Sequence, residues 1–486
     1  MPSSSAILDR SKGLAAQHWK ATQFDAAEDV LRRITDHGIE AIRIVFADQH
    51  GVTRGKTVMS SALCSALQNG LGAPSTLLLK DSSHATVFPV WQQDAGLGKG
   101  VLTGAADILM LPDPGTFKTL PWADKTGWML ADIYQADGQE TGLSTRRILK
   151  DALGLLAARG QNFITGLEVE FTILEVTDPK RDHASGDFNH APPETRLLSH
   201  GYQHLTEDRI DRLDDILTQL RRHAQALGMP VRSVEAEFGP SQVEFVFDPL
   251  PGLQAADMMT LFRNMVKQVC ARQGLHATFM SRPAFKNAMG SGWHLHQSLV
   301  DMATGANLFQ PAPDQALAPT ASSWIAGLLA HANAGCVLST PTVNGYKRYQ
   351  PFALAPDRIQ WGRDNRGAML RVLCKPGDTA SRIENRVGEP AANPYLYIAS
   401  QILAGLDGVD RALIPPAPVE QPYADDADLL PRDLGSALQV FETSDFWRQA
   451  LGDGFVDYLA HIKRAEWQRF LATVSEWEQR EYFSTF

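Results

Sequence analysis

The stretch Gly166-Leu167-Glu168-Val169-Glu170-Phe171-Thr172-Ile173 decides the fold of this chain. Its residues alternate between apolar and polar, which is the period of a β-strand, whose successive side chains point to opposite faces. The apolar residues therefore share one face, and Glu168 and Glu170 lie side by side on the other. Like charges at this spacing repel each other. The pattern predicts either a solvated strand face or a cation held between the two carboxylates.

Three later segments also place polar side chains opposite an apolar strand face, within residues 237–247, 292–299 and 381–387. A single histidine on a strand is usually structural, but two on one face, beside pairs of carboxylates, indicate ligands. Four such strands with their polar faces inward predict a barrel or trough. The polar positions are Glu237, Gln242 and Glu244, then His294, His296 and Ser298, then Arg382, Glu384 and Arg386.

The residue types in this predicted trough indicate hard cations and an anionic substrate. Oxygen-rich ligation with one imidazole favours Mg²⁺ or Mn²⁺ over Zn²⁺. Planar guanidinium groups suit phosphates and carboxylates, so we interpret a group of arginines as anion clamps, although each one alone is typical of a surface residue. These arginines are Arg348, Arg366, Arg371, Arg382 and Arg386.

Length, charge and cysteine spacing narrow the class of protein. The chain has 486 residues, too many for one growing core, so two domains are expected. Its formal net charge of -10 argues against nucleic-acid binding, which needs clustered Lys and Arg. The sequence has neither a secretory signal nor an apolar run long enough to cross a bilayer. The four cysteines are widely spaced, so we expect a cytoplasmic protein with reduced thiols and no membrane partner.

The pattern of elements predicts a small β-rich domain in residues 1–125 and a large α+β domain in residues 126–486. In the first, a helix is expected up to about residue 35, followed by a hairpin of two strands at 41–48 and 52–58 and a strand at 107–111. In the second, helices are predicted over residues 144–159, 206–227, 252–273 and 391–406.

The ordered motifs resemble the glutamine synthetase family along nearly the whole chain. After the Glu-x-Glu strand come Gly290-Ser291-Gly292-Trp293-His294-Leu295-His296-Gln297-Ser298, Asn344-Gly345-Tyr346-Lys347-Arg348 and Pro390-Ala391-Ala392-Asn393-Pro394. The resemblance implies an N-terminal β-grasp domain that completes the active site of a neighbouring subunit. It also implies a catalytic domain with an antiparallel barrel-like sheet and flanking helices, and a homo-dodecamer of two hexameric rings.

The resemblance further implies a two-step ligase that uses ATP and two or three Mg²⁺ or Mn²⁺ ions per site. ATP phosphorylates the γ-carboxylate of glutamate, and an amine then displaces phosphate to form a γ-glutamyl amide. By position, the residues that resemble the ligands of one ion are Glu170, Glu237 and Glu244, with Glu235 as an alternative to Glu237. The residues that resemble the ligands of the other ion are Glu168, His294 and Glu384.

The same comparison implies roles for the remaining polar residues. Arg348 and Arg386 resemble the residues that hold glutamate and the acyl phosphate, with Gly290 in the substrate site. Arg366 and Arg371 resemble the arginines that bind the ATP phosphates. His296 and Ser298 resemble residues on the nucleotide side. The predicted catalytic residues are thus Arg348, Arg366 and Arg386.

One departure from the family bears on the nucleophile. Family members that use ammonia carry a glutamate in the loop after the Tyr-Lys-Arg motif, and the matching residue here is Leu354. The change predicts an amine larger than ammonia, with Leu354, Phe352 and the region of Trp91 favouring an apolar alkyl or aromatic amine over a polyamine. Asp81 is a candidate for binding the amine from the N-terminal domain. The alternatives are an ordinary glutamine synthetase and a non-catalytic structural protein of this fold.

Overall fold

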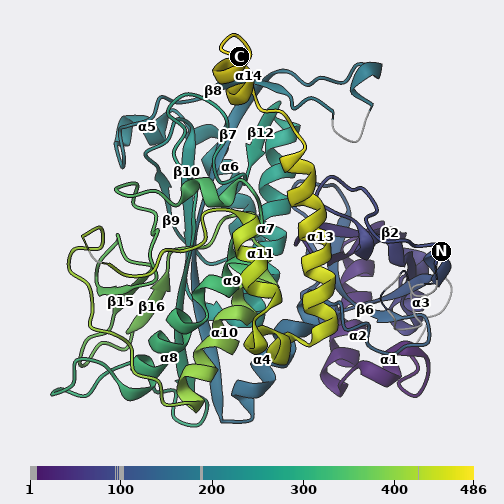
Figure 1. The fold of residues 1–486 in the computed structure, drawn as a ribbon. Coiled ribbons are helices and arrows are strands. Elements are labelled where there is room, and N and C mark those ends of the chain that lie inside the picture. Colours follow the sequence, from purple (N-terminus) through teal and green to yellow (C-terminus); the bar gives the residue numbers. More distant parts are fainter. Residues whose placement is uncertain (1–7, 93–94, 96, 98–102, 187–189, 425) are drawn as a thin grey trace.

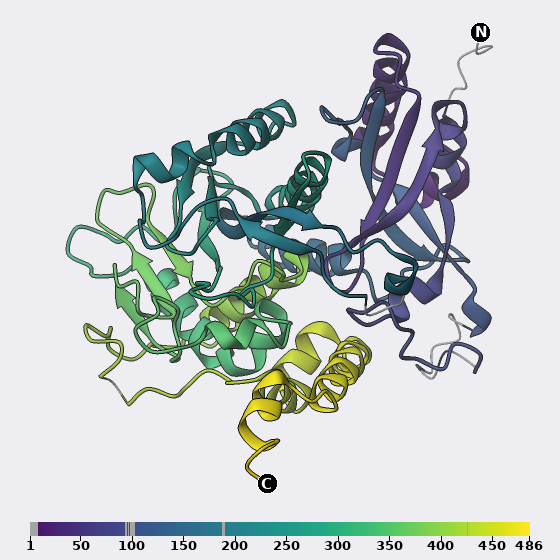
Figure 2. The ribbon, with the colours of Figure 1, turned by 90° about the horizontal axis from the view of Figure 1, so that it is seen from above.

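The structure is a computed structural model that describes residues 8–92, 95, 97, 103–186, 190–424 and 426–486. It contains two lobes, seen side by side in Figure 2, each built on its own sheet. The N-terminal sheet has the strand order β2-β1-β6-β4-β3, with β5 paired to β6. Its strands are β1 (Ala41–Ala47), β2 (Thr53–Met59), β3 (Leu71–Pro74), β4 (Asp107–Pro112), β5 (Lys118–Thr119) and β6 (Thr126–Gln135).

The predicted hairpin and N-terminal helix are both present. β1 and β2 pair antiparallel, from Ala41 opposite Met59 to Ala47 opposite Thr53. The helical segment is divided into α1 (Gly13–His18) and α2 (Ala21–Asp36), and α3 (Leu63–Asn69) follows β2. α2 packs through residues at helical spacing, an apolar stripe of the kind that faces a core. The buried residues of this stripe are Phe24, Ala27, Val30 and Ile34.

The N-terminal sheet extends beyond the boundary predicted at residue 125. β6 begins at Thr126, pairs parallel with β1 and antiparallel with β4, and ends at Gln135. Its partners are distant in sequence, so the local pattern of residues 126–135 could not indicate to which sheet this strand belongs. The N-terminal lobe therefore includes β6.

The second sheet forms the barrel-like centre of the large lobe. Its order is β14-β15-β16-β13-β7-β10-β9, and β8, β11 and β12 also pair with β7. The pairs are antiparallel except for β14 with β15. The strands are β7 (Gln161–Asp178), β8 (Glu194–Leu197), β9 (Val231–Ala236), β10 (Gln242–Phe247), β11 (Leu250–Pro251), β12 (Leu275–Thr278), β13 (Trp293–Asp301), β14 (Trp361–Arg363), β15 (Leu370–Leu373) and β16 (Arg382–Asn385).

Helices cover the apolar face of this sheet, with α4 and α7 packed against β7 (Figure 1). The predicted helix over residues 206–227 is broken into two short helices. The predicted helix from Ala391 starts later, because Asn393 caps the amides of Tyr395 and Leu396. The helices are α4 (Thr145–Ala157), α5 (Glu207–Asp211), α6 (Asp214–Ala226), α7 (Gly252–Arg272), α8 (Pro319–Ala330), α9 (Ala332–Ser339), α10 (Pro394–Asp410), α11 (Leu434–Glu442), α12 (Asp445–Leu451), α13 (Asp453–Leu471) and α14 (Glu476–Tyr482).

A buried ion cluster, here called the Arg146 cluster, joins the two lobes. Arg146 on α4 donates hydrogen bonds to Asp113 at 2.8 Å and Asp132 at 2.9 Å in the N-terminal lobe, and to Asp257 on α7 at 2.9 Å. Burial alone would raise the pKa of Asp132, but Arg146 and Lys150 beside it lower the pKa to about 2. Arg146 and Lys150 therefore offset most of the negative charge of the three aspartates.

The helix α13 is a second contact between the lobes (Figure 1). The hydroxyl of Tyr458 donates to the carbonyl of Leu78, and Arg469 forms an ion pair with Asp81. No single helix in the described ranges is long and apolar enough to span a membrane. One pair of helices bent by 80°, α8 with α9, meets the length and composition criteria only when the two are taken together.

Candidate active site

The polar faces of the central strands meet in one trough, here called the carboxylate trough. Glu168 and Glu170 on β7 lie directly opposite His294 on β13 and Glu244 on β10, respectively. Glu384 on β16 lies opposite His296 on β13. Residues directly opposite on neighbouring strands point to the same face of the sheet. The sheet register therefore gathers the polar residues of four strands, as predicted from their alternation.

Ligand atoms of the trough fall into three groups, each within 4.8 Å of one another. Glu168, His294 and Glu384 form one group, the same three residues that were predicted to bind one ion. Glu170 and Glu244 form a second group with His294. Each group offers carboxylate oxygens, which Mg²⁺ and Mn²⁺ prefer. These residues could hold divalent cations, although the arrangement alone does not identify the ion.

The third group contains both Glu235 and Glu237 together with Glu244. Glu235 on β9 lies directly opposite Glu244, so the register places it on the trough face. Glu237 follows the end of β9 and still raises the pKa of Glu170 through its negative charge. From sequence, Glu235 was an alternative to Glu237, whereas the structure brings both to the trough. The alternation in Glu235-Ala236-Glu237 indicates this placement, because residues two apart on a strand point to the same face.

Among the described residues, no lysine or arginine forms an ion pair with two carboxyls of the trough, Glu170 and Glu244. Burial, and then the charge of Glu237, raises the pKa of Glu170 to about 8. Burial and the charge of Glu170 raise the pKa of Glu244 to about 10. Among the described residues, the one basic side chain paired with Glu244 is His294, at 3.9 Å, and it carries charge only when protonated. Buried carboxylates that repel each other in this way fit a site for an added cation.

The other side of the trough is balanced by the chain itself. Burial would raise the pKa of Glu384, but Arg386 lowers it, and Arg371 donates a hydrogen bond to the same carboxylate at 3.0 Å. Burial and the neighbouring Arg386 lower the pKa of His294 to about 4. His294 is therefore neutral near pH 7, the form of the imidazole that can bind a metal ion.

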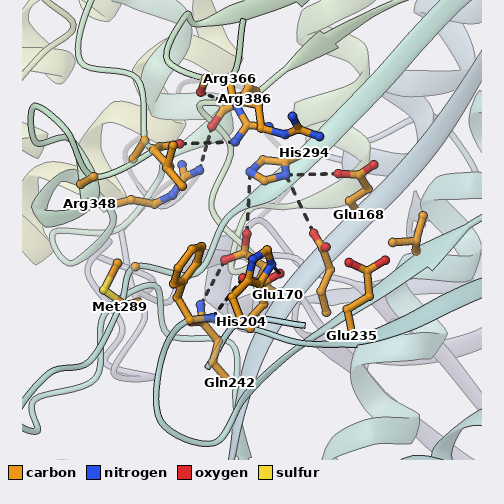
Figure 3. A pocket seen from close by; sticks show the side chains of 18 of the residues that line it. Glu168, Glu170, His204, Glu235, Gln242, Met289, His294, Arg348, Arg366 and Arg386 are labelled. Atoms are coloured by element: carbon orange, nitrogen blue, oxygen red, sulfur yellow. Dashed lines mark hydrogen bonds and ion pairs between the residues drawn. The ribbon is translucent and has the colours of Figure 1, made fainter. Parts of the chain in front are cut away.

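Four of the predicted arginines line one cavity of about 360 Å³ together with the carboxylates: Arg348, Arg366, Arg371 and Arg386. In Figure 3, Arg348, Arg366 and Arg386 lie on one side of the pocket and the labelled carboxylates on the other. Arg348 is buried and donates hydrogen bonds to the carbonyls of Arg386 at 2.9 Å and Val387 at 3.1 Å. These bonds fix the direction of its guanidinium group, whose planar donors suit a carboxylate or phosphate.

Gly290 has a steric role beside Arg348. A Cβ atom at this position would lie 2.9 Å from Cγ of Arg348, closer than side chains pack. At Gly292, a Cβ atom would lie 2.4 Å from an Arg348 nitrogen. The glycines of the Gly-Ser-Gly motif therefore make room for the arginine.

The residues predicted to bind ATP are divided between two cavities. Arg366 and Arg371 line the main cavity, whereas His296 and Ser298 line a second cavity of about 290 Å³ on the other side of Glu168. Arg382 also lines the second cavity and donates a hydrogen bond to His296 at 3.2 Å. Glu168 lines both cavities, so the two meet at the carboxylate trough.

The residues predicted to contact the amine lie in different places in the structure. Leu354 lines the main cavity, as expected for a residue that contacts a substrate there. Phe352 packs against Tyr423 and Trp91 is 83% exposed, and within the described part of the chain neither one lines this cavity. The carboxylate of Asp81 is buried and paired with Arg469, so in this chain it stabilises the contact with α13.

A barrel-like sheet that carries carboxylates, a neutral histidine and fixed arginines defines an enzyme that acts on anionic substrates with divalent metal ions. The chain belongs to the glutamine synthetase family: the family described as "Glutamine synthetase, catalytic domain" matches residues 142–482. The match covers most of the large lobe, including every residue of the carboxylate trough.

Several relatives place the chain within this family. It is 41% identical to a γ-glutamylanilide synthase of an Acinetobacter species, over 96% of this chain and 97% of that protein. It is 31% identical to a glutamine synthetase of Pyrococcus abyssi, over 91% and 96%. The solved structure "Apo GmaS without ligand" covers 94% of this chain with a TM-score of 0.78 and 30% identity.

Proposed function

We propose that this protein joins the γ-carboxylate of glutamate to a primary amine larger than ammonia, using ATP, with an alkyl or aromatic amine as its substrate. The observation that carries the proposal is the apolar side chain of Leu354 in the wall of a cavity that also contains the carboxylate trough. The 41% identity to a γ-glutamylanilide synthase supports it, since the identity to a glutamine synthetase is 31%.

The acidic residues and His294 of the trough are proposed to bind two divalent ions. Glu168, His294 and Glu384 hold one divalent ion, and Glu170, Glu244 and Glu237 hold another, with Glu235 beside them. Mg²⁺ or Mn²⁺ bound there supplies positive charge that stabilises the transferring phosphoryl group. The raised pKa values of Glu170 and Glu244 support this assignment, because each carboxyl requires a cation to ionise near pH 7.

The arginines orient the anionic reactants. Arg348 and Arg386 bind glutamate and its acyl phosphate beside Gly290, and Arg366 and Arg371 bind the phosphates of ATP. His296 and Ser298 contact the nucleotide from the second cavity. The γ-carboxylate oxygen attacks the terminal phosphorus of ATP, and ADP leaves. The amine nitrogen then attacks the acyl carbon, and the bond from that carbon to the phosphate oxygen breaks. The nitrogen loses one proton, which the departing phosphate takes up, and the amide is formed.

An apolar side chain at position 354 alters the balance between amines. Ammonium is a cation at neutral pH, and a carboxylate could both bind it and accept its proton. Leucine does neither, and an apolar wall disfavours the bare cation. For a substituted amine, burying about 100 Å² of apolar surface contributes roughly 2.5 kcal/mol. The protein should therefore favour a substituted amine over ammonia by at least about tenfold in kcat/KM.

The test is amine-dependent release of ADP with ammonium, putrescine, ethylamine and aniline. We expect aniline or ethylamine to give the highest kcat/KM. If ammonium is used as efficiently as any other amine, the protein is an ordinary glutamine synthetase. If no amine stimulates ADP release, the alternative of a non-catalytic structural protein is correct.

We further propose a cytoplasmic homo-dodecamer of two hexameric rings, with the N-terminal lobe completing the neighbouring subunit's site. A repeated head-to-tail contact between lobes closes into a ring. Light scattering of the active enzyme measures its size, and a fully active monomer would contradict this assembly.

A further inference from the structure

One wall of the main cavity is a loop, residues 201–205, that has no part in the roles proposed above. His204 and Leu205 of this loop line the cavity. The loop is hydrogen-bonded to the segment after β9: the amide of Tyr202 donates to the carbonyl of Phe238 at 2.6 Å. The amide of Leu205 donates to the carbonyl of Ala236 at 3.1 Å. Both side chains are therefore held by backbone contacts to the segment that carries Glu237.

His204 presents a flat ring to the cavity. Its imidazole stacks on the ring of Phe238, with centroids 4.3 Å apart and an angle of 17° between the planes. Phe238 covers one face of the imidazole, while the His204 side chain as a whole remains 33% exposed. In Figure 3, His204 lies on the opposite side of His294 from Arg366 and Arg386. A supported aromatic ring of this kind is a surface on which a second ring can stack.

Leu205 and Leu354 share an unusual combination of properties. Both line the cavity, and they are 60% and 49% exposed. Both have left-handed backbones, with φ of 54° and 55°. Residues other than glycine rarely adopt this backbone conformation, and those that do are concentrated at ligand sites. Two exposed leucines in a cavity are stabilised when a ligand covers them, because apolar surface leaves water.

Charge separates the places of the two substrates in this cavity. Glutamate is anionic, so it is attracted to Arg348 and Arg386 on the arginine side of the cavity. His204 lies on the carboxylate side of the cavity, with its Nε2 atom 3.6 Å from an oxygen of Glu237. The wall formed by His204 and Leu205 is thus left for the other reactant, the amine, whose nitrogen must approach the acyl carbon near the trough.

We propose that His204 and Leu205 are specificity-determining residues that bind the aromatic ring of an arylamine, with the ring stacked on the open face of the imidazole. This inference rests on the proposed function and adds the residues that select the substituent. Phe238 is the support, and Leu354 contributes apolar contact from its own loop.

The test compares kcat/KM for aniline and ethylamine in the wild type and in variants of the full-length enzyme. His204→Ala should lower kcat/KM for aniline about tenfold, through KM for the amine, because a stacked aromatic pair is lost. Ethylamine should change less than about twofold, since it has no ring to stack. Leu205→Ala should act in the same direction with a smaller effect.

Two further variants separate stacking from other roles. His204→Phe keeps a flat ring but removes the nitrogen near Glu237, and it should retain the use of aniline. His200→Ala, an exposed histidine in the segment leading to the same loop, should leave both amines unchanged. KM for ATP and the Mg²⁺ concentration for half-maximal rate should not change in any of these variants.

The outcomes distinguish this inference from the proposed function. If the wild type releases ADP with ammonium alone, the proposed function is wrong. If the wild type uses aniline but His204→Ala leaves its kcat/KM unchanged, or lowers both amines equally, only the inference about His204 is wrong. A loss of aniline use in His204→Phe as large as in His204→Ala also overturns stacking.

Discussion

The carboxylate trough and the Arg146 cluster both bury several acidic side chains, but they differ in what balances the charge. In the Arg146 cluster, one guanidinium contacts three aspartates, and the pKa of Asp132 falls to about 2. In the trough, Glu170 and Glu244 face other carboxylates, and their pKa values rise to about 8 and about 10. A balanced cluster stabilises the fold, whereas an unbalanced one is a site for something that the chain does not itself supply.

The largest expected effect is on activity, from removing a trough residue. Glu170→Ala or His294→Ala should abolish ADP formation, because each loses a ligand worth several kcal/mol of transition-state stabilisation. The fold should persist, since His294 is neutral near pH 7 and its 3.8 Å contact with Glu170 therefore has no attraction between opposite charges to lose. Glu175→Ala is the control, on the same strand but paired with Arg196. Near-normal turnover at saturating Mg²⁺ in either trough variant would mean that the site is misplaced.

The second prediction concerns stability rather than chemistry. Arg146→Met should lower the free energy of unfolding by about 3–5 kcal/mol, because it leaves buried aspartates without their cation. Arg147→Ala is the matched control on the same helix, where the arginine is 45% exposed and its ion pairs contribute at most about 1 kcal/mol. Chemical denaturation measures both. Equal losses in the two variants would show that burial does not distinguish these ion pairs.

The two regions should also respond to pH in opposite directions. The depressed pKa of Asp132 contributes stability above about pH 4, which is lost as pH falls toward 2. The raised pKa of Glu170 gives a contribution to the stability of the metal-free protein that is fully present below about pH 4.5 and is lost as pH rises through 8. Mg²⁺ should therefore raise Tm more at pH 8 than at pH 6. A Tm increment independent of pH would contradict the unbalanced trough.

The smallest expected effect is a change in amine preference, from substituting Leu354 in the wall of the main cavity. Leu354→Glu adds a carboxylate at the cavity wall and should narrow the preference for a substituted amine over ammonium by about tenfold, or about 1.4 kcal/mol. Phe352→Glu places the same charge two residues away on an 81% exposed side chain outside the cavity wall. Its amine preference should match the wild type. Identical preferences in the two variants would remove Leu354 from the amine site.

Strand alternation made the trough predictable from sequence. Glu168, Glu170, Glu244, His294 and Glu384 each lie on a strand whose opposite face is apolar, so a period of two residues places them correctly. The pattern predicted that the polar faces of these strands meet, but it did not predict which strands pair. The large lobe and the hairpin of residues 41–58 were predictable for the same reason.

Features that depend on distant partners were not predictable in this way. The pairing of β6 with β1 joins segments far apart in the chain, so the lobe boundary was placed too early. The aromatic contact of His204 depends on a loop fastened by backbone hydrogen bonds, which leave no periodic pattern. Phe352 resembled a pocket residue because its neighbour Leu354 is one, yet it packs against Tyr423 instead.

The shared position of Glu168 between two cavities has a kinetic consequence. If the nucleotide enters through the second cavity, as proposed for His296 and Ser298, and the amine through the main cavity, neither would block the path of the other. Geometry then imposes no order of release, and a dead-end complex holding ADP and the amine together is accessible. Product inhibition by ADP should accordingly be noncompetitive toward the amine, and raising the amine concentration should not relieve it.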